Sequence, residues 1–386
     1  MRDFVSDTAR NIKPSGIRKF FDLCAGSKDI ISLGVGEPDF TTPWQISDAG
    51  INTIKKGRTT YTANAGLEDL RKEISSYLKE RFNVNFTYKD IIVTVGASEA
   101  IDLSLRAIIN TGDEILVPDP SYVSYAPCVE LCGGKPVPVK CYEIDGFALT
   151  PEELEKAITP KTKALIFPYP NNPTGGIMSA AQIEAILPII RKHEILIITD
   201  EIYAELTYGQ KHVSIASYPD VNCIYINGFS KAFAMTGWRV GYVCATGEVY
   251  KAMLKIHQYA IICAPIFSQY AALEGLRKGK SNDYAFVREM RDEYDRRRTF
   301  MYSSFREMGL SCFEPKGAFY VMPCIKSTGM DAQEFAMKLL EKKKVAVVPG
   351  DAFGDSGKYY IRCSYAYSMK SLMKAVKLIK EFVEEL

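Results

Sequence analysis

Short apolar runs separated by helix-like repeats dominate the middle of the chain. The runs that are nearly free of polar residues are 91–95, 115–117, 164–167, 195–199 and 223–227. Continuous apolar runs of this length are typical of parallel strands that are covered on both faces, whereas strands with one solvated face alternate. The pattern therefore predicts a mostly parallel sheet whose strands are buried.

Helix signals fill the intervals between these runs. Apolar residues recur at the spacing of one helical face from 97 to 108. Thr150 begins the sequence TPEE and Ser179 begins the sequence SAAQ, and both read as capping boxes at the start of a helix. The second box leads into a helical pattern that continues through Ile190. Strands that alternate with helices predict an α/β domain with helices flanking the sheet.

The last hundred residues follow a different pattern. A long charged helix is predicted over 283–307, strands over 317–322, 345–348 and 359–364, and an amphipathic helix over 372–383. This order is typical of a smaller α+β domain. We expect a large domain over 46–285 and a small domain that both termini form together, over 1–45 and 286–386.

Composition narrows the kind of partner. The chain has 386 residues, of which 47% are hydrophobic and 24% charged, and its net charge is only +2. This balance argues against nucleic acid or a membrane surface as the main partner, and no apolar run reaches the roughly 20 residues that span a bilayer. The opening residues, MRDFVSDTARNIK, do not form a secretion signal. We therefore expect a cytoplasmic protein.

Cysteines and histidines give no sign of a metal site. The ten cysteines are scattered, and Cys128 and Cys132 have no second pair at metal-ligand spacing. The three histidines lie on unrelated segments. We interpret the cysteines as reduced, mostly structural thiols and expect no metal.

Candidate chemistry follows the predicted strands, because ligands of α/β sheets bind at the carboxyl ends of strands. The run 91–95 leads into Gly96-Ala97-Ser98, where a helix start and small residues would leave N–H groups open to a phosphate. The run 195–199 leads into Asp200. That carboxylate is either a solvated loop acid or helix cap, or an acid that faces a cation at the strand end.

Lys231 follows the run 223–227 and stands among small and apolar residues. A lone lysine is usually a solvated surface residue, but here loss of water would lower its pKa and make the amine nucleophilic. Arg239, further along the same segment, is a candidate bidentate anion binder. Asn172, in PNNPTG after the run 164–167, is either a turn residue or a donor to a ligand oxygen.

These segments together resemble the class I aminotransferases among the fold-type I pyridoxal-phosphate enzymes. The segment 228–241, GFSKAFAMTGWRVG, is similar to the lysine signature of that family. The motifs GEPDF, YTANAG, NNPTG, DEIY and IRCSYA occur in the family's order, and the resemblance spans 33–366. VSYAP, GGKPV and YDRRR are similar to archaeal aromatic-type members, within the branch that contains prokaryotic aspartate and aromatic aminotransferases.

The resemblance implies a transaminase with pyridoxal 5'-phosphate as its cofactor. An aromatic amino acid or aspartate would donate the amino group, and 2-oxoglutarate would accept it. A β-lyase that acts on cystathionine-like substrates is the alternative, because such relatives share the same lysine, aspartate and arginine positions. A regulatory protein that retains only the fold is a remote third reading.

The resemblance also implies how the cofactor is held. Lys231 would bind it covalently and then move the Cα proton of the substrate, while Asp200 would pair with the ring nitrogen. Tyr203 and Asn172 would bind the phenolic oxygen of the ring, and Tyr122 would stack on its face. The residues that would hold the phosphate are Ala97, Ser98 and Arg239.

Substrate binding and assembly are implied in the same way. Arg362 would bind the substrate α-carboxylate as a bidentate pair, with help from Asn172 and the backbone of Gly36. Tyr61, in YTANAG, would reach the cofactor phosphate of a neighbouring subunit. The protein would then be a homodimer with shared active sites.

Two positions depart from the family's pattern. Gly228 stands where many members have a serine, so one phosphate hydroxyl is missing. Ser98 stands where some aspartate-specific relatives have a lysine for the side-chain carboxylate. The second departure argues against a strict preference for aspartate.

Overall fold

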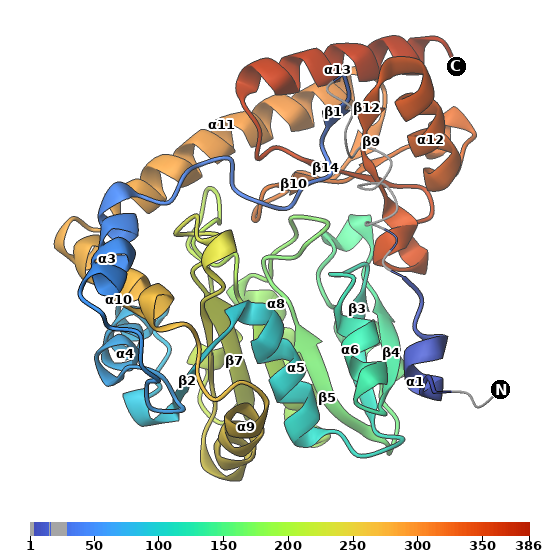
Figure 1. The fold of residues 1–386 in the computed structure, drawn as a ribbon. Helices are drawn as coiled ribbons and strands as arrows, with labels where there is room; N and C mark the ends of the chain where they lie inside the picture. Colours follow the sequence, from blue (N-terminus) through green and yellow to red (C-terminus); the bar gives the residue numbers. More distant parts are fainter. Residues whose placement is uncertain (1–3, 15, 17–28) are drawn as a thin grey trace.

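A seven-stranded sheet forms the centre of the molecule in the computed structural model, which describes residues 4–14, 16 and 29–386 (Figure 1). The strands run across the sheet in the order β2-β8-β7-β6-β5-β3-β4. Their bounds are β2 Ile91–Thr94, β3 Glu114–Asp119, β4 Lys135–Lys140, β5 Thr162–Phe167, β6 Leu196–Asp200, β7 Cys223–Gly228 and β8 Gly241–Cys244.

The sheet is mostly parallel, as the apolar runs predicted. The pairs β3–β4, β3–β5, β5–β6 and β6–β7 are parallel. Strand β8 is antiparallel to both of its neighbours, β7 and β2. The carboxyl ends of the six strands other than β8 therefore lie along one edge of the sheet.

Successive residues of each strand are buried on opposite faces of the sheet. Ile198 packs with helices α5, α6 and α9, whereas its neighbour Ile197 packs with α7 and α8. Strand β8 divides in the same way, because Val243 faces α5 while Tyr242 faces α4 and α10. Burial on both faces explains why the strands read as unbroken apolar runs.

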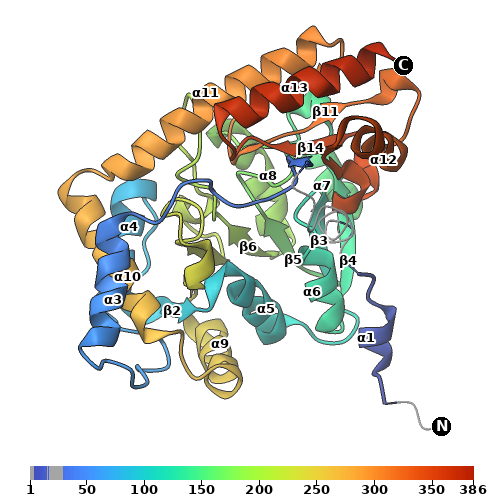
Figure 2. The ribbon, with the colours of Figure 1, turned by 45° about the horizontal axis from the view of Figure 1, so that its top comes forward.

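Helices cover both faces (Figure 2). Their bounds are α1 Asp7–Asn11, α3 Trp44–Lys55, α4 Glu68–Phe82, α5 Gly96–Ile108, α6 Tyr125–Leu131, α7 Pro151–Ala157, α8 Ala180–Lys192, α9 Gly247–Ala260, α10 Ile266–Ser281, α11 Ala285–Glu307, α12 Ala332–Lys343 and α13 Met369–Glu384. The predicted cap Ser179 exchanges both hydrogen bonds of a capping box with Gln182. Thr150 accepts the Glu153 N–H at the start of α7, which is one half of such a box. No helix among the described residues is long and apolar enough to cross a membrane.

The C-terminal part packs its helices over short strands. These strands are β9 Ser311–Cys312, β10 Tyr320–Val321, β11 Pro323–Cys324, β12 Val345–Ala346, β13 Val348–Pro349 and β14 Ile361–Ser364. Near the other end of the chain, β1 (Ile31–Ser32) pairs in parallel with β12. Leu33 belongs to the same apolar cluster as α11, α12 and α13. The segment 31–33 therefore packs with the C-terminal part (Figure 1).

The sequence patterns missed two strands of the seven-stranded sheet as well as the short strands β1, β9 and β11, and they overextended others. Neither β4 nor β8 was predicted. The strand predicted over 317–322 is confined to β10, because Ala318 has φ 57° and cannot continue an extended chain. The run 345–348 divides into β12, which pairs with β1, and β13, which pairs with β14.

Candidate active site

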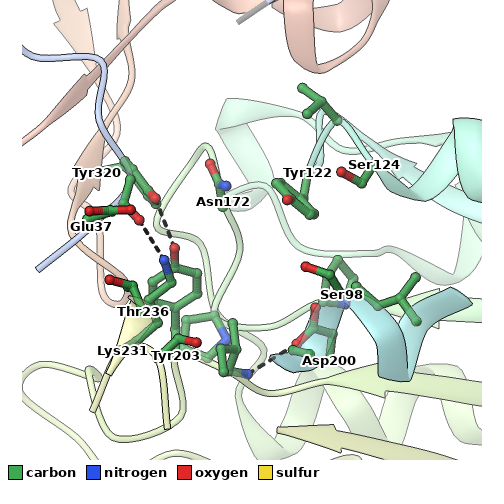
Figure 3. A pocket seen from close by; sticks show the side chains of 18 of the residues that line it. Glu37, Ser98, Tyr122, Ser124, Asn172, Asp200, Tyr203, Lys231, Thr236 and Tyr320 are labelled. Atoms are coloured by element: carbon green, nitrogen blue, oxygen red, sulfur yellow. Dashed lines mark hydrogen bonds between the residues drawn. The ribbon is translucent and has the colours of Figure 1, made fainter. Parts of the chain in front are cut away.

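One cavity of about 860 Å³ lies at the carboxyl ends of the sheet strands and under the C-terminal part. Such a volume suits a small ligand or cofactor. All but one of the residues predicted for the site line it, as the close view shows for several of them (Figure 3). These residues are Gly36, Ala97, Ser98, Tyr122, Asn172, Asp200, Tyr203, Lys231, Arg239 and Arg362. The exception is Tyr61.

Lys231 follows β7 and points its amine into the cavity (Figure 3). Its Nζ donates a hydrogen bond to the carbonyl oxygen of Gly36 at 2.5 Å. Burial lowers the pKa of Lys231 to about 8, although the carboxylate of Glu37 acts in the opposite direction. Far more of this amine is therefore neutral, and nucleophilic, near neutral pH than of an ordinary lysine.

Asp200 is the last residue of β6 and is buried. Tyr125 donates its hydroxyl to Oδ2 at 2.8 Å, and the N–H of Ile202 donates to Oδ1 at 3.2 Å. Burial raises the pKa of Asp200 to about 6, and the two hydrogen bonds lower it against that effect. No Lys or Arg side chain forms an ion pair with Asp200 among the described residues, so a cationic ligand would complete its environment.

The start of α5 and the Arg239 guanidinium form an anion-binding corner. Gly96 has φ 76°, and a Cβ at this position would lie 2.6 Å from Arg239 Nη2. Only glycine therefore lets the guanidinium approach the first turn of α5. The backbone of Arg239 is itself in the left-handed region, at φ 52°, a strain that often marks functional positions. Ala97 and Ser98 line the same corner, where N–H groups and the helix dipole favour an anion.

Two tyrosine hydroxyls meet beside Lys231. Tyr203 and Tyr320 are 2.9 Å apart, oxygen to oxygen (Figure 3). Burial raises the pKa of both phenols, so both remain protonated donors. Tyr122 lies across the cavity, with its ring edge-on to Tyr125 at 5.5 Å between centroids.

Arg362 is a buried cation without a carboxylate partner among the described residues. Its side chain is on β14, and the residue is only 2% exposed. Nη1 donates to Asn172 Oδ1 at 2.9 Å, Nη2 donates to the Gly34 carbonyl, and Nε has no partner. The guanidinium also lies 4.3 Å from the centroid of the Tyr320 ring. A buried guanidinium with spare donors is a ready site for a carboxylate.

Tyr61 lies outside the cavity of its own chain and is 79% exposed. Its loop contacts the segment after α9, where Asn64 donates to the Ile262 carbonyl at 3.0 Å. Tyr61 therefore has no part in the cavity of its own chain, and its contact with a second subunit stays a prediction.

Several residues of the site were not predicted from the sequence. Tyr125 contacts Asp200, Tyr320 contacts Tyr203 and Arg362, and Glu37 lines the cavity next to Gly36. Tyr125 follows Tyr122 at a spacing of three, which could have placed both on one side of a turn. Glu37 lies within GEPDF, a motif in which only Gly36 was given a role. Tyr320 stands in a predicted strand and gave no further signal.

Comparison with known proteins identifies the class. Residues 28–379 match the family model of aminotransferase class I and II, and the chain belongs to this family. It is 45% identical over 385 residues to an aspartate aminotransferase of Pyrococcus abyssi, covering 99% of this chain and 98% of the relative. It is 42% identical to aromatic-amino-acid aminotransferase 2 of Thermococcus litoralis, again covering 99% and 98%.

Solved structures agree with this membership. The crystal structure of an aromatic aminotransferase from Pyrococcus horikoshii superposes with a TM-score of 0.90 at 42% identity, covering 96% of this chain and 99% of that one. The fold and family inferred from the motifs are thus confirmed. The protein is a transaminase that uses pyridoxal 5'-phosphate.

The cavity fits this cofactor. Its corner at α5 and Arg239 suits a phosphate, Lys231 offers an amine to an aldehyde, and buried Asp200 suits a protonated ring nitrogen. Among the described residues, no cluster of three His, Cys, Asp or Glu side chains could hold a metal ion.

Proposed function

We propose that the protein transfers the amino group of an aromatic amino acid to 2-oxoglutarate, with aspartate as a weaker donor. The observation that carries this proposal is the buried, carboxylate-free Arg362 in the same cavity as the Lys231 amine. An α-amino acid or a 2-oxo acid presents one carboxylate next to the reacting carbon. Arg362 would bind that carboxylate and place the reacting carbon near Lys231.

The residues would divide the chemistry among them. The cofactor supplies an electron sink for the charge that develops at the substrate Cα. Lys231 would bind the cofactor and would act as the base that moves the Cα proton, which its lowered pKa favours. Asp200 would keep the ring nitrogen protonated, and Tyr203 and Asn172 would donate to the phenolic oxygen. Tyr122 would stack on the ring.

The donor preference follows from the charges around the cavity. Lys231, Arg239 and Arg362 are the only Lys or Arg side chains that line it in the described part of the chain. Each of the three has a role above, so no further cation is left for a side-chain carboxylate. Ser124 offers a hydroxyl donor to the distal carboxylate of 2-oxoglutarate. An aromatic side chain needs no such partner, so aromatic donors are favoured.

We also propose a homodimer in which Tyr61 of each chain reaches the phosphate corner of the other. Exposed apolar residues support this proposal, since Trp44, Ile54 and Tyr61 are all more than half exposed. Ile51, Ile54 and Phe267 line a shallow groove where α3 packs against α10. Clustered exposed apolar residues are typical of interfaces between subunits.

Two further assignments are proposed. Residues 1–45 and 286–386 form a small domain over the pocket, which the pairing of β1 with β12 supports for the described residues. The cytoplasm is the proposed location, since no disulfide joins the cysteines of the described residues.

A donor panel tests the function. Purified protein with added cofactor is given tyrosine, phenylalanine or aspartate together with 2-oxoglutarate, and glutamate formation is measured. We expect kcat/KM for the aromatic donors to exceed that for aspartate by about tenfold, which corresponds to roughly 1.4 kcal/mol of transition-state binding.

Lys231→Ala is the control and should lower turnover by several orders of magnitude. Cystathionine without any 2-oxo acid tests the alternative, because loss of its thiol with release of pyruvate and ammonia, in the absence of glutamate formation, would identify a β-lyase. A clear preference for aspartate would contradict the donor assignment while leaving the transaminase in place.

A further inference from the structure

Tyr125 joins two parts of the proposed cofactor site from behind. It is the first residue of α6 and is buried, with 3% of its surface exposed. Its hydroxyl donates to Asp200 Oδ2 at 2.8 Å. The edge of its ring meets the Tyr122 ring, with 5.5 Å between centroids and 82° between planes. One side chain thus touches both the acid and the aromatic ring that face the cofactor.

The direction of the hydrogen bond is fixed. Burial, together with the nearby Asp200 charge, raises the pKa of Tyr125 well above its ordinary value, so the phenol stays protonated. Tyr125 therefore donates, and the carboxylate accepts. The second oxygen of Asp200 accepts the Ile202 N–H at 3.2 Å. With both oxygens anchored, the plane of the carboxylate is set by the protein before any ligand is bound.

We propose that Tyr125 is a positioning residue for transamination, which holds Asp200 ionised and aimed at the ring nitrogen of the cofactor. The proposal rests on the role assigned to Asp200 above. Burial opposes ionisation of Asp200, and the Tyr125 hydroxyl is the first of the contacts that oppose this effect. Without that hydroxyl, Asp200 takes up a proton more readily and pairs less well with a protonated ring nitrogen.

Binding of the cofactor to the cofactor-free protein tests this proposal directly. The ligands are pyridoxal 5'-phosphate and its deaza analogue, in which a C–H group replaces the ring nitrogen. The variant is Tyr125→Phe, which keeps the ring contact with Tyr122 and removes only the hydroxyl. Dissociation constants are measured near pH 6, where Asp200 titrates, and at about pH 8.5, where an aspartate of ordinary or modestly raised pKa is ionised.

We expect Tyr125→Phe to weaken binding of the natural cofactor by roughly tenfold near pH 6 and by much less at pH 8.5, since one pKa unit corresponds to tenfold. Binding of the deaza analogue should be unchanged, because that ligand makes no demand on the charge of Asp200. Equal losses for both ligands, or no loss for either, would overturn the proposal.

Tyr77→Phe is the matched control. Tyr77 is also buried and donates to a carboxylate, Glu205, at 2.8 Å, but it lies on α4 outside the cavity. It should leave both dissociation constants unchanged. Tyr125→His restores a donor at the same place and should recover part of the preference for the natural cofactor. A histidine variant that behaves as badly as Tyr125→Phe would also contradict the proposal.

Asp200→Asn separates this inference from the proposed function. If it removes the preference for the natural cofactor and Tyr125→Phe does not, only the role of Tyr125 is wrong. If Asp200→Asn leaves the preference unchanged, Asp200 does not face the ring nitrogen, and the role assigned to it fails as well.

Discussion

At the scale of single residues, burial decides the chemistry of the cavity. It moves the pKa of Lys231 down to about 8 and that of Asp200 up to about 6, so the two values approach each other from opposite ends. An amine near its pKa at neutral pH can both accept and return a proton. When the pH is near the pKa of an acid, each hydrogen bond that the acid accepts changes its ionised fraction. The hydrogen bond from Tyr125 therefore affects the charge of Asp200.

The pH dependence of amine labelling checks the state of Lys231. In the cofactor-free protein, a small amine-reactive reagent should modify Lys231 at a rate that rises with pH and levels off above about pH 8, because only the neutral amine reacts. Peptide mass spectrometry measures the rate.

Lys156 serves as the comparison, since its hydrogen bond to Glu153 raises its pKa. Its labelling should still be rising at about pH 10, near the ordinary lysine value. A Lys231 rate that also rises beyond pH 10 would show that the amine is solvated.

Much of the site was predictable because its residues follow strand ends. Lys231 and Asp200 stand directly after apolar runs, where the topology of an α/β sheet brings them together. Tyr125 and Tyr320 were not predictable in this way. Their roles depend on which face of a short element they occupy and on contacts between segments far apart in the chain. Gly228, interpreted from the sequence as a lost hydroxyl, also has a packing role, since a Cβ there would lie 2.9 Å from the Cα of Gly241.

At the scale of elements, local signals predicted helices better than strands. Ser179 caps α8 as its sequence predicted, because a capping box is complete within four residues. Strand β4 was missed since Pro136 and Pro138 argue against a strand, yet it lies at the edge of the sheet, where missing N–H donors are tolerated. Strand β8 is short and reverses the sheet direction, which no local pattern indicates.

The cap of α8 yields a local prediction. Ser179→Ala removes the acceptor for the Gln182 N–H and should destabilise the first turn by about 1 kcal/mol. Amide hydrogen exchange in that turn should then speed up by about fivefold at fixed pH.

Ser179→Gly is the control, because glycine at this position costs only a few tenths of a kcal/mol. Exchange rates in the alanine variant that match those of the native chain would mean that the cap contributes nothing.

At the scale of the whole molecule, two contacts join the end of β3 to the C-terminal part. The buried Asp119 accepts from Ser356 Oγ at 3.0 Å and from its N–H at 3.3 Å. The Ser121 N–H donates to the Phe353 carbonyl at 3.0 Å. Phe353 in turn lies 4.9 Å from the Arg362 guanidinium. These contacts hold the segment 350–357 against the end of β3 and against Arg362, which lines the cavity.

Ser356→Ala should loosen this segment more as the pH rises. Burial raises the pKa of Asp119, so the folded protein binds more protons than the unfolded chain just above the ordinary aspartate pKa, and stability falls as Asp119 ionises. Loss of the serine hydroxyl raises that pKa further and leaves the carboxylate short of a donor. The cost should be about 1–2 kcal/mol at neutral pH and smaller in acid.

Thermal unfolding at about pH 5 and about pH 8 measures the effect. Ser311→Ala is the matched control, because Ser311 is exposed and its hydroxyl bond to Glu143 should matter little. A cost for Ser356→Ala that does not grow with pH would contradict the argument.

The seating of Arg362 within the protein core has a consequence for how such an enzyme diversifies. In the proposed function, the feature shared by all amino acids, a carboxylate beside the reacting carbon, binds a side chain that is anchored to Asn172 and the Gly34 backbone. The side chain, which differs among amino acids, would instead contact residues at the rim of the cavity. New specificities can therefore arise by exchange of rim residues, while the recognition of an amino acid as such is inherited unchanged.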